Sequence, residues 1–278
     1  MPDSELFQID LKQILRAKAP QQAKKIPGFL ISLLSRIICR DGLNDFLRVN
    51  NNATGVDFMK NAVKYFEIDL KLKGEENIPP FSEKAVFVAN HPLGGLDGIC
   101  LSAVLGEKYN EQIKYLVNDL LYFIEPLKSI FVPINKHGSQ AKGGARSINE
   151  AFHSENQIIT FPAGICSRKI KGKIRDVDWK KMFIVKAVEY KRNVVPVYFE
   201  ARNTAFFYTI ANIRKALKIK FNLEMLLLPS EMFKSKGSSF TIYFGKPIPW
   251  QTFDSSKSPR AWSEIVKEEV YQLKNKVK

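Results

Sequence analysis

The sequence predicts an α/β protein: a mixed, largely parallel sheet flanked by helices, with an N-terminal helical segment. From about residue 57, short apolar stretches typical of strands alternate with stretches whose apolar residues recur at helical spacing. Such alternation favours a mostly parallel sheet with helices packed on it. The chain has 278 residues, 45% of them hydrophobic, which is enough for a sizeable core.

Residues 1–55 are expected to be helical, and residues 56–278 to form the main domain. Residues 4–18 show helical spacing and end before Pro20. Pro27 begins a second helix, predicted over 27–40, with its apolar residues on one face. Either this amphipathic helix packs on the domain, as most do, or it lies in a membrane interface.

The main domain is expected to contain six strands and five further helices. The expected strands are 85–90, 113–118, 130–135, 157–163, 194–200 and 239–245. The expected helices are 97–106, 141–154, 179–192, 205–218 and 258–276. Functional residues in such folds gather just beyond the carboxyl ends of the strands.

Composition narrows the class of partner. The formal net charge of +15 attracts polyanions. Nucleic acid fits poorly, because zinc-finger and RNP-type motifs are absent and the basic residues are spread over the whole chain. Three cysteines without CxxC spacing indicate neither a disulfide framework nor a zinc site. The polar N-terminus and the lack of a run of about 20 apolar residues predict a cytoplasmic protein.

The first expected strand runs into a turn that contains His91, Pro92, Gly94 and Gly95, followed by Asp97 at the expected N-cap of the next helix. A neutral imidazole can accept a proton while a carboxylate holds its other ring nitrogen, so the pair suits general base catalysis. The alternative is a turn histidine beside a helix-capping aspartate. The pair alone leaves both interpretations open.

A second strand end favours the catalytic interpretation. The strand at 157–163 ends in Phe-Pro-Ala-Gly, with Pro162 in the turn. Backbone amides near Gly164 and Ile165 could hold a developing oxyanion. Ser167 and Arg168 follow, and a guanidinium can clamp a carboxylate or a phosphate.

These motifs resemble the blocks of the glycerolipid acyltransferase superfamily. Asn-His-Pro-Leu-Gly-Gly-Leu-Asp-Gly is similar to its first block, where a His and an Asp act as base and orienter, and Phe-Pro-Ala-Gly-Ile-Cys-Ser-Arg to its third. Residues 131–136 lie where the acceptor-binding block belongs, and 194–199 resemble the fourth block. Stretches at 200–208, 226–233 and 244–250 resemble the hemolysin-like branch, which includes ornithine- and glycine-lipid O-acyltransferases.

The sequence also departs from the family pattern. The spacing between the block-one His and Asp is one residue longer than usual, and a bulge at Gly94-Gly95 is expected to absorb it. Ala163 replaces the usual glutamate, and Lys136 is the nearest candidate for the usual arginine of block two. Since those positions help to hold glycerol phosphate in the family, an N-acylated amino acid becomes a plausible acceptor. The expected head-group ligands are Lys136, Ser167 and Arg168.

The resemblance implies transfer of a fatty acyl group from acyl carrier protein, or from acyl-CoA, to a lysolipid hydroxyl. No metal or other cofactor is expected, and the protein is expected at the inner face of the cytoplasmic membrane. The basic run 168–181 is either a solvated face or a docking surface for acyl carrier protein or anionic lipid. Its docking residues would be Lys169, Lys171, Lys173 and Arg175. Two alternatives are acylation of lysophosphatidate and a non-enzymatic lipid-binding role.

Overall fold

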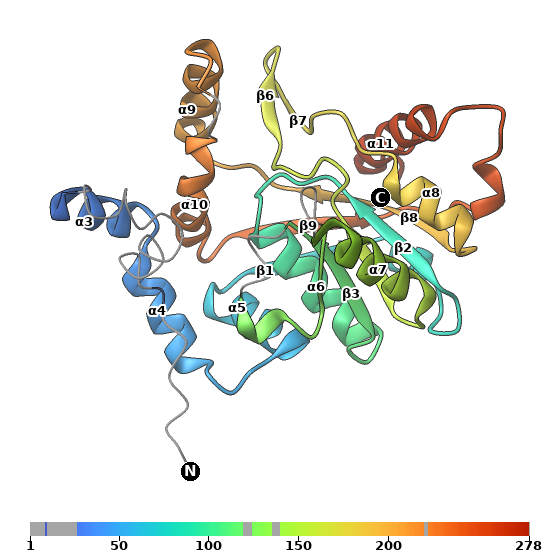
Figure 1. The fold of residues 1–278 in the computed structure, drawn as a ribbon, viewed down its shortest axis with the longest axis horizontal. Helices are drawn as coiled ribbons and strands as arrows, with labels where there is room; N and C mark the ends of the chain where they lie inside the picture. Colours follow the sequence, from blue (N-terminus) through green and yellow to red (C-terminus); the bar gives the residue numbers. More distant parts are fainter. Residues whose placement is uncertain (1–8, 10–26, 119–123, 135–139, 220–221, 278) are drawn as a thin grey trace.

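A seven-stranded sheet lies at the centre of the fold (Figure 1). The computed structural model describes residues 9, 27–118, 124–134, 140–219 and 222–277. The strand order is β1-β9-β8-β2-β5-β3-β4. The strands are β1 (Asp69–Lys73), β2 (Ala85–Ala89), β3 (Ile113–Val117), β4 (Phe131–Pro133), β5 (Gln157–Thr160), β8 (Asn193–Glu200) and β9 (Ser239–Phe244).

The directions of the strands confirm a mixed, largely parallel sheet. Strands β2, β3, β4, β5 and β8 run parallel, whereas β9 is antiparallel to β8 and parallel to β1. All six expected strands are present. The sequence analysis did not anticipate β1, which alternates charged and apolar residues at the sheet edge, or the two-stranded hairpin of β6 (Arg168–Ile170) and β7 (Lys173–Arg175).

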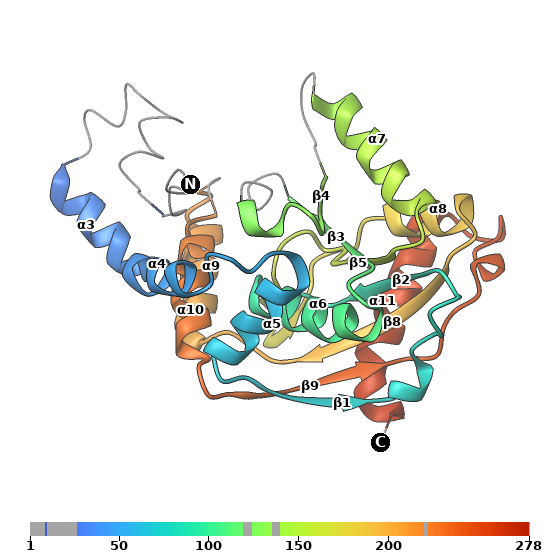
Figure 2. The same cartoon turned by 90° about the horizontal axis from the view of Figure 1, so that it is seen from below.

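Helices cover both faces of the sheet (Figures 1 and 2). The α-helices of the main domain are α5 (Gly55–Tyr65), α6 (Leu96–Lys108), α7 (Gln140–His153), α8 (Met182–Glu189), α9 (Ala205–Ala216), α10 (Leu228–Lys234) and α11 (Pro259–Lys276). The 3-10 helices are η1 (Glu75–Asn77), η3 (Glu125–Leu127), η4 (Leu223–Leu227) and η5 (Trp250–Thr252). The five expected helices are confirmed; α5 and α10 were not expected.

Two separate apolar cores result from the alternation of side chains along each strand. In β2, Ala85, Phe87 and Ala89 pack with residues of α5 and α6 on one face. Val86 and Val88 of the same strand pack with residues of α7, α8 and α11 on the other face. A strand buried on both sides reads as a continuous apolar run, which explains the stretch that precedes His91.

The expected N-terminal helix over 27–40 is instead two helices, α3 (Gly28–Ile37) and α4 (Arg40–Val49). Helix α4 buries Phe46 and Leu47 and approaches α10 closely, since a Cβ on Gly42 would lie 2.6 Å from the Phe233 ring. Helix α3 itself buries no residue, whereas Ile38 at its C-cap is buried, so the choice between packing on the domain and lying in a membrane interface stays a prediction. The helix predicted over 4–18 lies outside the described residues except for residue 9.

No helix in the described ranges is both long and apolar enough to cross a bilayer. The domain boundary proposed at residue 55 stays a prediction: α5 begins there, and residues on both sides of it, such as Phe46 of α4 and Val56 of α5, belong to the same apolar core.

Asn90 fixes the start of the turn that follows β2. Its side-chain amide donates to the carbonyl of Phe199 on β8 (3.0 Å) and accepts from the amide of Phe199 (2.7 Å). The side chain therefore extends the β2–β8 ladder by one step, with both partners buried.

We expect Asn90→Asp to destabilise the protein by about 1–3 kcal/mol at neutral pH, because the carbonyl of Phe199 would lose its donor and face an oxygen. Urea unfolding measures the change. Asn52→Asp, in an exposed turn, is the matched control and should leave the midpoint nearly unchanged. Equal midpoints for the two variants would contradict the role given to Asn90.

Candidate functional site

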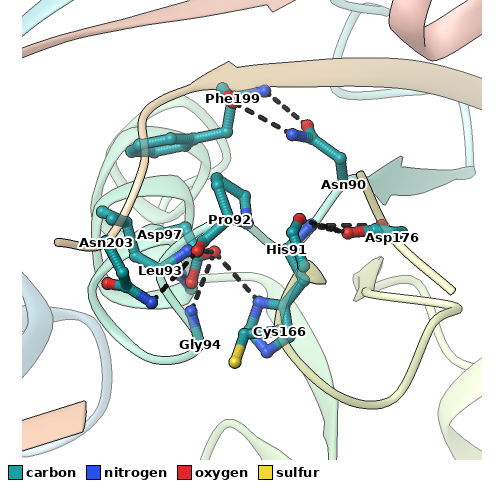
Figure 3. Close-up of polar contacts among 12 residues, drawn as sticks. Asn90, His91, Pro92, Leu93, Gly94, Asp97, Cys166, Asp176, Phe199 and Asn203 are labelled. Atoms are coloured by element: carbon teal, nitrogen blue, oxygen red, sulfur yellow. Dashed lines mark hydrogen bonds and ion pairs between the residues drawn. The ribbon is translucent and has the colours of Figure 1, made fainter. Parts of the chain in front are cut away.

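The backbone of His91 is held on both sides by the segment that follows β5 (Figure 3). The amide of His91 donates to both carboxylate oxygens of Asp176 (3.2 and 3.3 Å). The carbonyl of His91 accepts from the amide of Ser167 (2.7 Å). The structure thus brings the two predicted strand-end motifs into direct contact.

The carboxylate of Asp97 orients the His91 ring. His91 Nδ1 donates to Oδ2 of Asp97 (3.0 Å), because an ionised carboxylate can only accept. The same oxygen accepts from the amides of Leu93 (2.9 Å) and Gly94 (3.3 Å), and Oδ1 accepts from the amide of Gly98 (2.9 Å). Asp97 is fully buried, so these four donors replace the water that it has lost.

Asp97 lies in the first turn of α6 and not at the N-cap position, which Gly95 occupies. The expected N-cap position of Asp97 is therefore off by two residues, whereas the catalytic role of the His91–Asp97 pair stays a prediction. The carboxylate binds amides around the helix start and the imidazole at the same time.

The extra residue between His91 and Asp97 is accommodated in the turn and not in a strand bulge, since β2 ends at Ala89. Gly94 has φ +77°, a left-handed backbone that favours glycine. A Cβ there would also lie 2.9 Å from Cys166 Cβ and from Leu228 Cδ1. A Cβ at Gly95 would meet no atom within 4 Å, so only the first glycine is required by space.

Burial lowers the pKa of the His91 imidazole, but the charge of Asp97, its hydrogen bond to the ring and the charge of Asp176 outweigh burial. The pKa of His91 therefore lies above its ordinary value. Burial would raise the pKa of the Asp97 carboxyl, but the charge and hydrogen bond of His91 and the amides of Leu93 and Gly98 hold it below its ordinary value. Each member of the pair thus stabilises the charged form of the other.

The other ring nitrogen of His91 is available. Across the described residues, Nε2 has no hydrogen-bond partner, and the ring lies against Phe161 with centroids 4.4 Å apart. The His91 side chain is 12% exposed. With the proton on Nδ1, a neutral ring presents Nε2 as an acceptor for a substrate proton.

The predicted oxyanion amides differ in availability. The amide of Gly164 donates to the carbonyl of Phe161 (3.0 Å). The amide of Ile165 has no partner within the described part of the chain. Pro162 is buried, and its carbonyl accepts from the amide of Lys180 (3.0 Å), which fixes the turn.

Of the predicted head-group ligands, two bind the protein itself. The Ser167 hydroxyl donates to Asp176 Oδ1 (2.6 Å). Arg168 is buried, and its Nη2 donates to Oε1 of the fully buried Glu224 (2.8 Å). Lys136 lies outside the described residues, so its role stays a prediction.

Asp176 is a site residue that the sequence analysis did not identify. This buried carboxylate accepts from the His91 amide, from Ser167 and from the indole of Trp179 (2.9 Å). Burial raises the pKa of Asp176 above its ordinary value, although the hydrogen bonds from Ser167 and Trp179 oppose this. Asp178, two residues later, is exposed, so sequence alone could not distinguish the two acids.

A cavity of about 350 Å³ opens beside the turn that carries His91. Asn90 and Pro92, the neighbours of His91, line it together with Tyr271 and Arg202. Arg202 is exposed, and among the described residues it has no ion-pair partner. Glu200, also in the wall, is paired with Lys274.

The four predicted docking residues lie on the β6–β7 hairpin. Lys169, Lys171 and Lys173 are exposed. Arg175 is engaged within the protein, because it pairs with Glu268 (2.7 Å) and lies over the Tyr271 ring. Within the described ranges, no three His, Cys, Asp or Glu side chains are grouped so that they could hold a metal ion.

We expect the pKa of the His91 imidazole to fall in Asp176→Asn and to fall further in Asp97→Asn, because each substitution removes a negative charge near the ring. NMR titration of the ring resonances measures this, and His91→Gln assigns the signal. Asp178→Asn removes an exposed charge two residues from Asp176 and is the matched control. An unchanged His91 pKa in Asp176→Asn would contradict the electrostatic role of Asp176.

Comparison with known proteins shows the family to which the chain belongs. Residues 13–278 match the protein family described as Acyltransferase. A lyso-glycine lipid O-acyltransferase of Bacteroides thetaiotaomicron is 50% identical over 273 residues, which cover 98% of this chain and 100% of that protein. One of the same name from Phocaeicola vulgatus is 48% identical over 273 residues, 98% of each chain.

A solved structure is also similar. The crystal structure of the 1-acyl-sn-glycerophosphate (LPA) acyltransferase PlsC from Thermotoga maritima aligns with a TM-score of 0.47 and 19% identity, over 88% of this chain and 92% of that one. Because the family match extends over nearly the whole sequence and two relatives are so similar throughout, the chain belongs to the acyltransferase family and is an acyltransferase.

Proposed function

We propose that this acyltransferase moves a fatty acyl group from a thioester to the hydroxyl of a lyso-glycine lipid, with His91 as the general base. The observation that carries the proposal is the buried His91–Asp97 pair, which leaves Nε2 as a free acceptor. The names of the two relatives, at 50% and 48% identity, support the acceptor. The donor is acyl carrier protein or acyl-CoA, at the inner face of the cytoplasmic membrane.

The proposed reaction needs one proton carrier. Nε2 of His91 accepts the proton of the acceptor hydroxyl as its oxygen attacks the thioester carbonyl. Asp97 stabilises the imidazolium, and the amide of Ile165 is the candidate donor to the oxyanion. When the tetrahedral intermediate collapses, the C–S bond breaks and the imidazolium returns the proton to the leaving thiolate.

Arg202 is a better candidate to bind the head group of the acceptor than Ser167 or Arg168. Arg168 and Ser167 already bind Glu224 and Asp176, whereas Arg202 lines the cavity without an ion-pair partner in the described ranges. We propose that the guanidinium of Arg202 binds the carboxylate of the acceptor, as guanidinium groups commonly do. Lys136 stays a second candidate.

Two other acceptors and a non-enzymatic role are the alternatives to this proposal. Lysophosphatidate is the alternative acceptor, and a lyso-ornithine lipid is a further amino-acid acceptor. The non-enzymatic lipid-binding alternative is wrong, because the chain is an acyltransferase.

Purified protein should transfer acyl groups to N-(hydroxyacyl)glycine faster than to lysophosphatidate or a lyso-ornithine lipid. His91→Ala should lower the rate by roughly 10²–10⁴-fold, because a general base is lost. His153→Ala, an exposed histidine at the end of α7, is the matched control. The ratio kcat/KM should fall as pH drops through the His91 pKa, since the base must be neutral.

Retention of most activity in His91→Ala would show that another group takes the proton. Preference for lysophosphatidate would leave the mechanism intact and refute the acceptor.

Arg202→Gln should raise KM for the glycine lipid by roughly tenfold or more, because a charge-assisted hydrogen bond is lost. With the corresponding glycinamide lipid, which has no carboxylate, wild type and Arg202→Gln should behave alike. Arg260→Gln, an exposed arginine on α11, is the control. If Arg202→Gln loses equal activity on both acceptors, the guanidinium does not recognise the carboxylate.

A further inference from the structure

Helix α9 and the β6–β7 hairpin project from the same side of the molecule (Figure 1). The two elements touch, since β6 packs against α9. Both carry large apolar side chains in contact with solvent. We call the exposed face of α9 and the hairpin, defined by Ile170, Phe206, Ile213 and Leu217, the projecting surface.

The exposed apolar residues of α9, together with Leu217 at its C-cap, form a stripe on one side of the helix. Phe206, Ile213 and Leu217 are 56%, 50% and 66% exposed. Their spacing of seven and four residues places them on one face at 3.6 residues per turn. The helix packs on the protein through Phe207 and Tyr208, so the stripe points away from the core.

Exposed lysines lie on the hairpin and at the end of α9. On the hairpin, Ile170 is 42% exposed and lies between Lys169 and Lys171, with Lys173 on the second strand. Lys215 and Lys218 are exposed at the end of α9. In the described part of the chain, none of these five lysines has an ion-pair partner.

We infer that the projecting surface docks on an anionic lipid bilayer. Apolar side chains flanked by unpaired lysines match the boundary between acyl chains and phosphate head groups. An acidic carrier protein would satisfy the lysines but would leave the stripe of α9 in water. The inference deepens the proposed function and rests on it in one respect, that the acceptor is a membrane lipid.

A buried ion-pair network connects this surface to the catalytic turn. Glu224 accepts from Arg168 at the start of β6 and from Arg214 on α9, at 2.8 Å each. The residue before Arg168, Ser167, donates its amide to the carbonyl of His91. Bilayer contact at α9 would therefore hold the His91 turn at a fixed position relative to the lipid.

Co-sedimentation of the full chain with vesicles of phosphatidylcholine, with and without phosphatidylglycerol, tests the inference. Wild type should bind the anionic vesicles more tightly. The triple variant Phe206→Ser, Ile213→Ser, Leu217→Ser should lose at least roughly tenfold in affinity, because three apolar side chains no longer enter the bilayer. The control Val185→Ser, Ile265→Ser changes exposed apolar residues of α8 and α11 and should bind like wild type.

A second variant, with Lys169, Lys171 and Lys173 changed to Gln, should lose the preference for phosphatidylglycerol and keep weak binding to neutral vesicles. Transfer to a short-chain, water-soluble acceptor should be unchanged in the triple variant, whereas transfer to acceptor embedded in vesicles should fall. Vesicle binding needs no turnover, so it decides the inference even if the proposed acceptor is wrong.

Three results would overturn the inference. The first is wild-type vesicle affinity in the triple variant. The second is a change in oligomeric state on gel filtration with vesicle binding intact, which would show that a second copy covers the stripe. The third is loss of acyl carrier protein binding in the lysine variant without loss of vesicle binding, which would assign the hairpin to an acidic protein.

Discussion

The burial of the Asp97 carboxylate is the constraint on which the site depends. A carboxylate without water must find donors within the protein, and here it has three backbone amides and the His91 ring. Two of those amides belong to the turn itself, so the turn and the ring orientation form together. The left-handed backbone at Gly94 allows one of these amides to reach the carboxylate. The result is a fixed tautomer with Nε2 available.

Two carboxylates, Asp97 and Asp176, hold different parts of His91. Asp97 binds the ring of His91, and Asp176 binds its backbone amide. Both raise the pKa of the imidazole against the effect of burial. A base with a higher pKa accepts a proton more readily, but a smaller fraction of it is neutral at a given pH. Burial acts in the opposite direction and limits the rise of the His91 pKa.

Much of the fold was predictable because its signals are local. Strands buried on both faces read as short apolar runs. His91 and Asp97 lie close together in the sequence, so they could be considered as a pair, and the second strand-end motif favoured the catalytic interpretation. Strand β1 was not predicted from the sequence, because its charged and apolar residues alternate at the sheet edge. Asp176 and Glu224 were not identified, because the residues that connect them to the site, His91 and Arg168, lie 85 and 56 residues away. An acidic residue looks the same in sequence whether it is solvated or buried.

Arg168 shows that the role of a motif residue depends on its contacts in the folded protein. Beside a catalytic motif, a guanidinium suggests a ligand for an anion, but Glu224 engages it and shares its other oxygen with Arg214. Because one buried carboxylate between two cations is costly to break, this network is a rigid connection. The chemistry thus depends on buried groups, whereas the proposed lipid contacts use exposed ones. Mutations of exposed side chains on the projecting surface leave this network intact, so they are expected to alter access to lipid without disturbing His91.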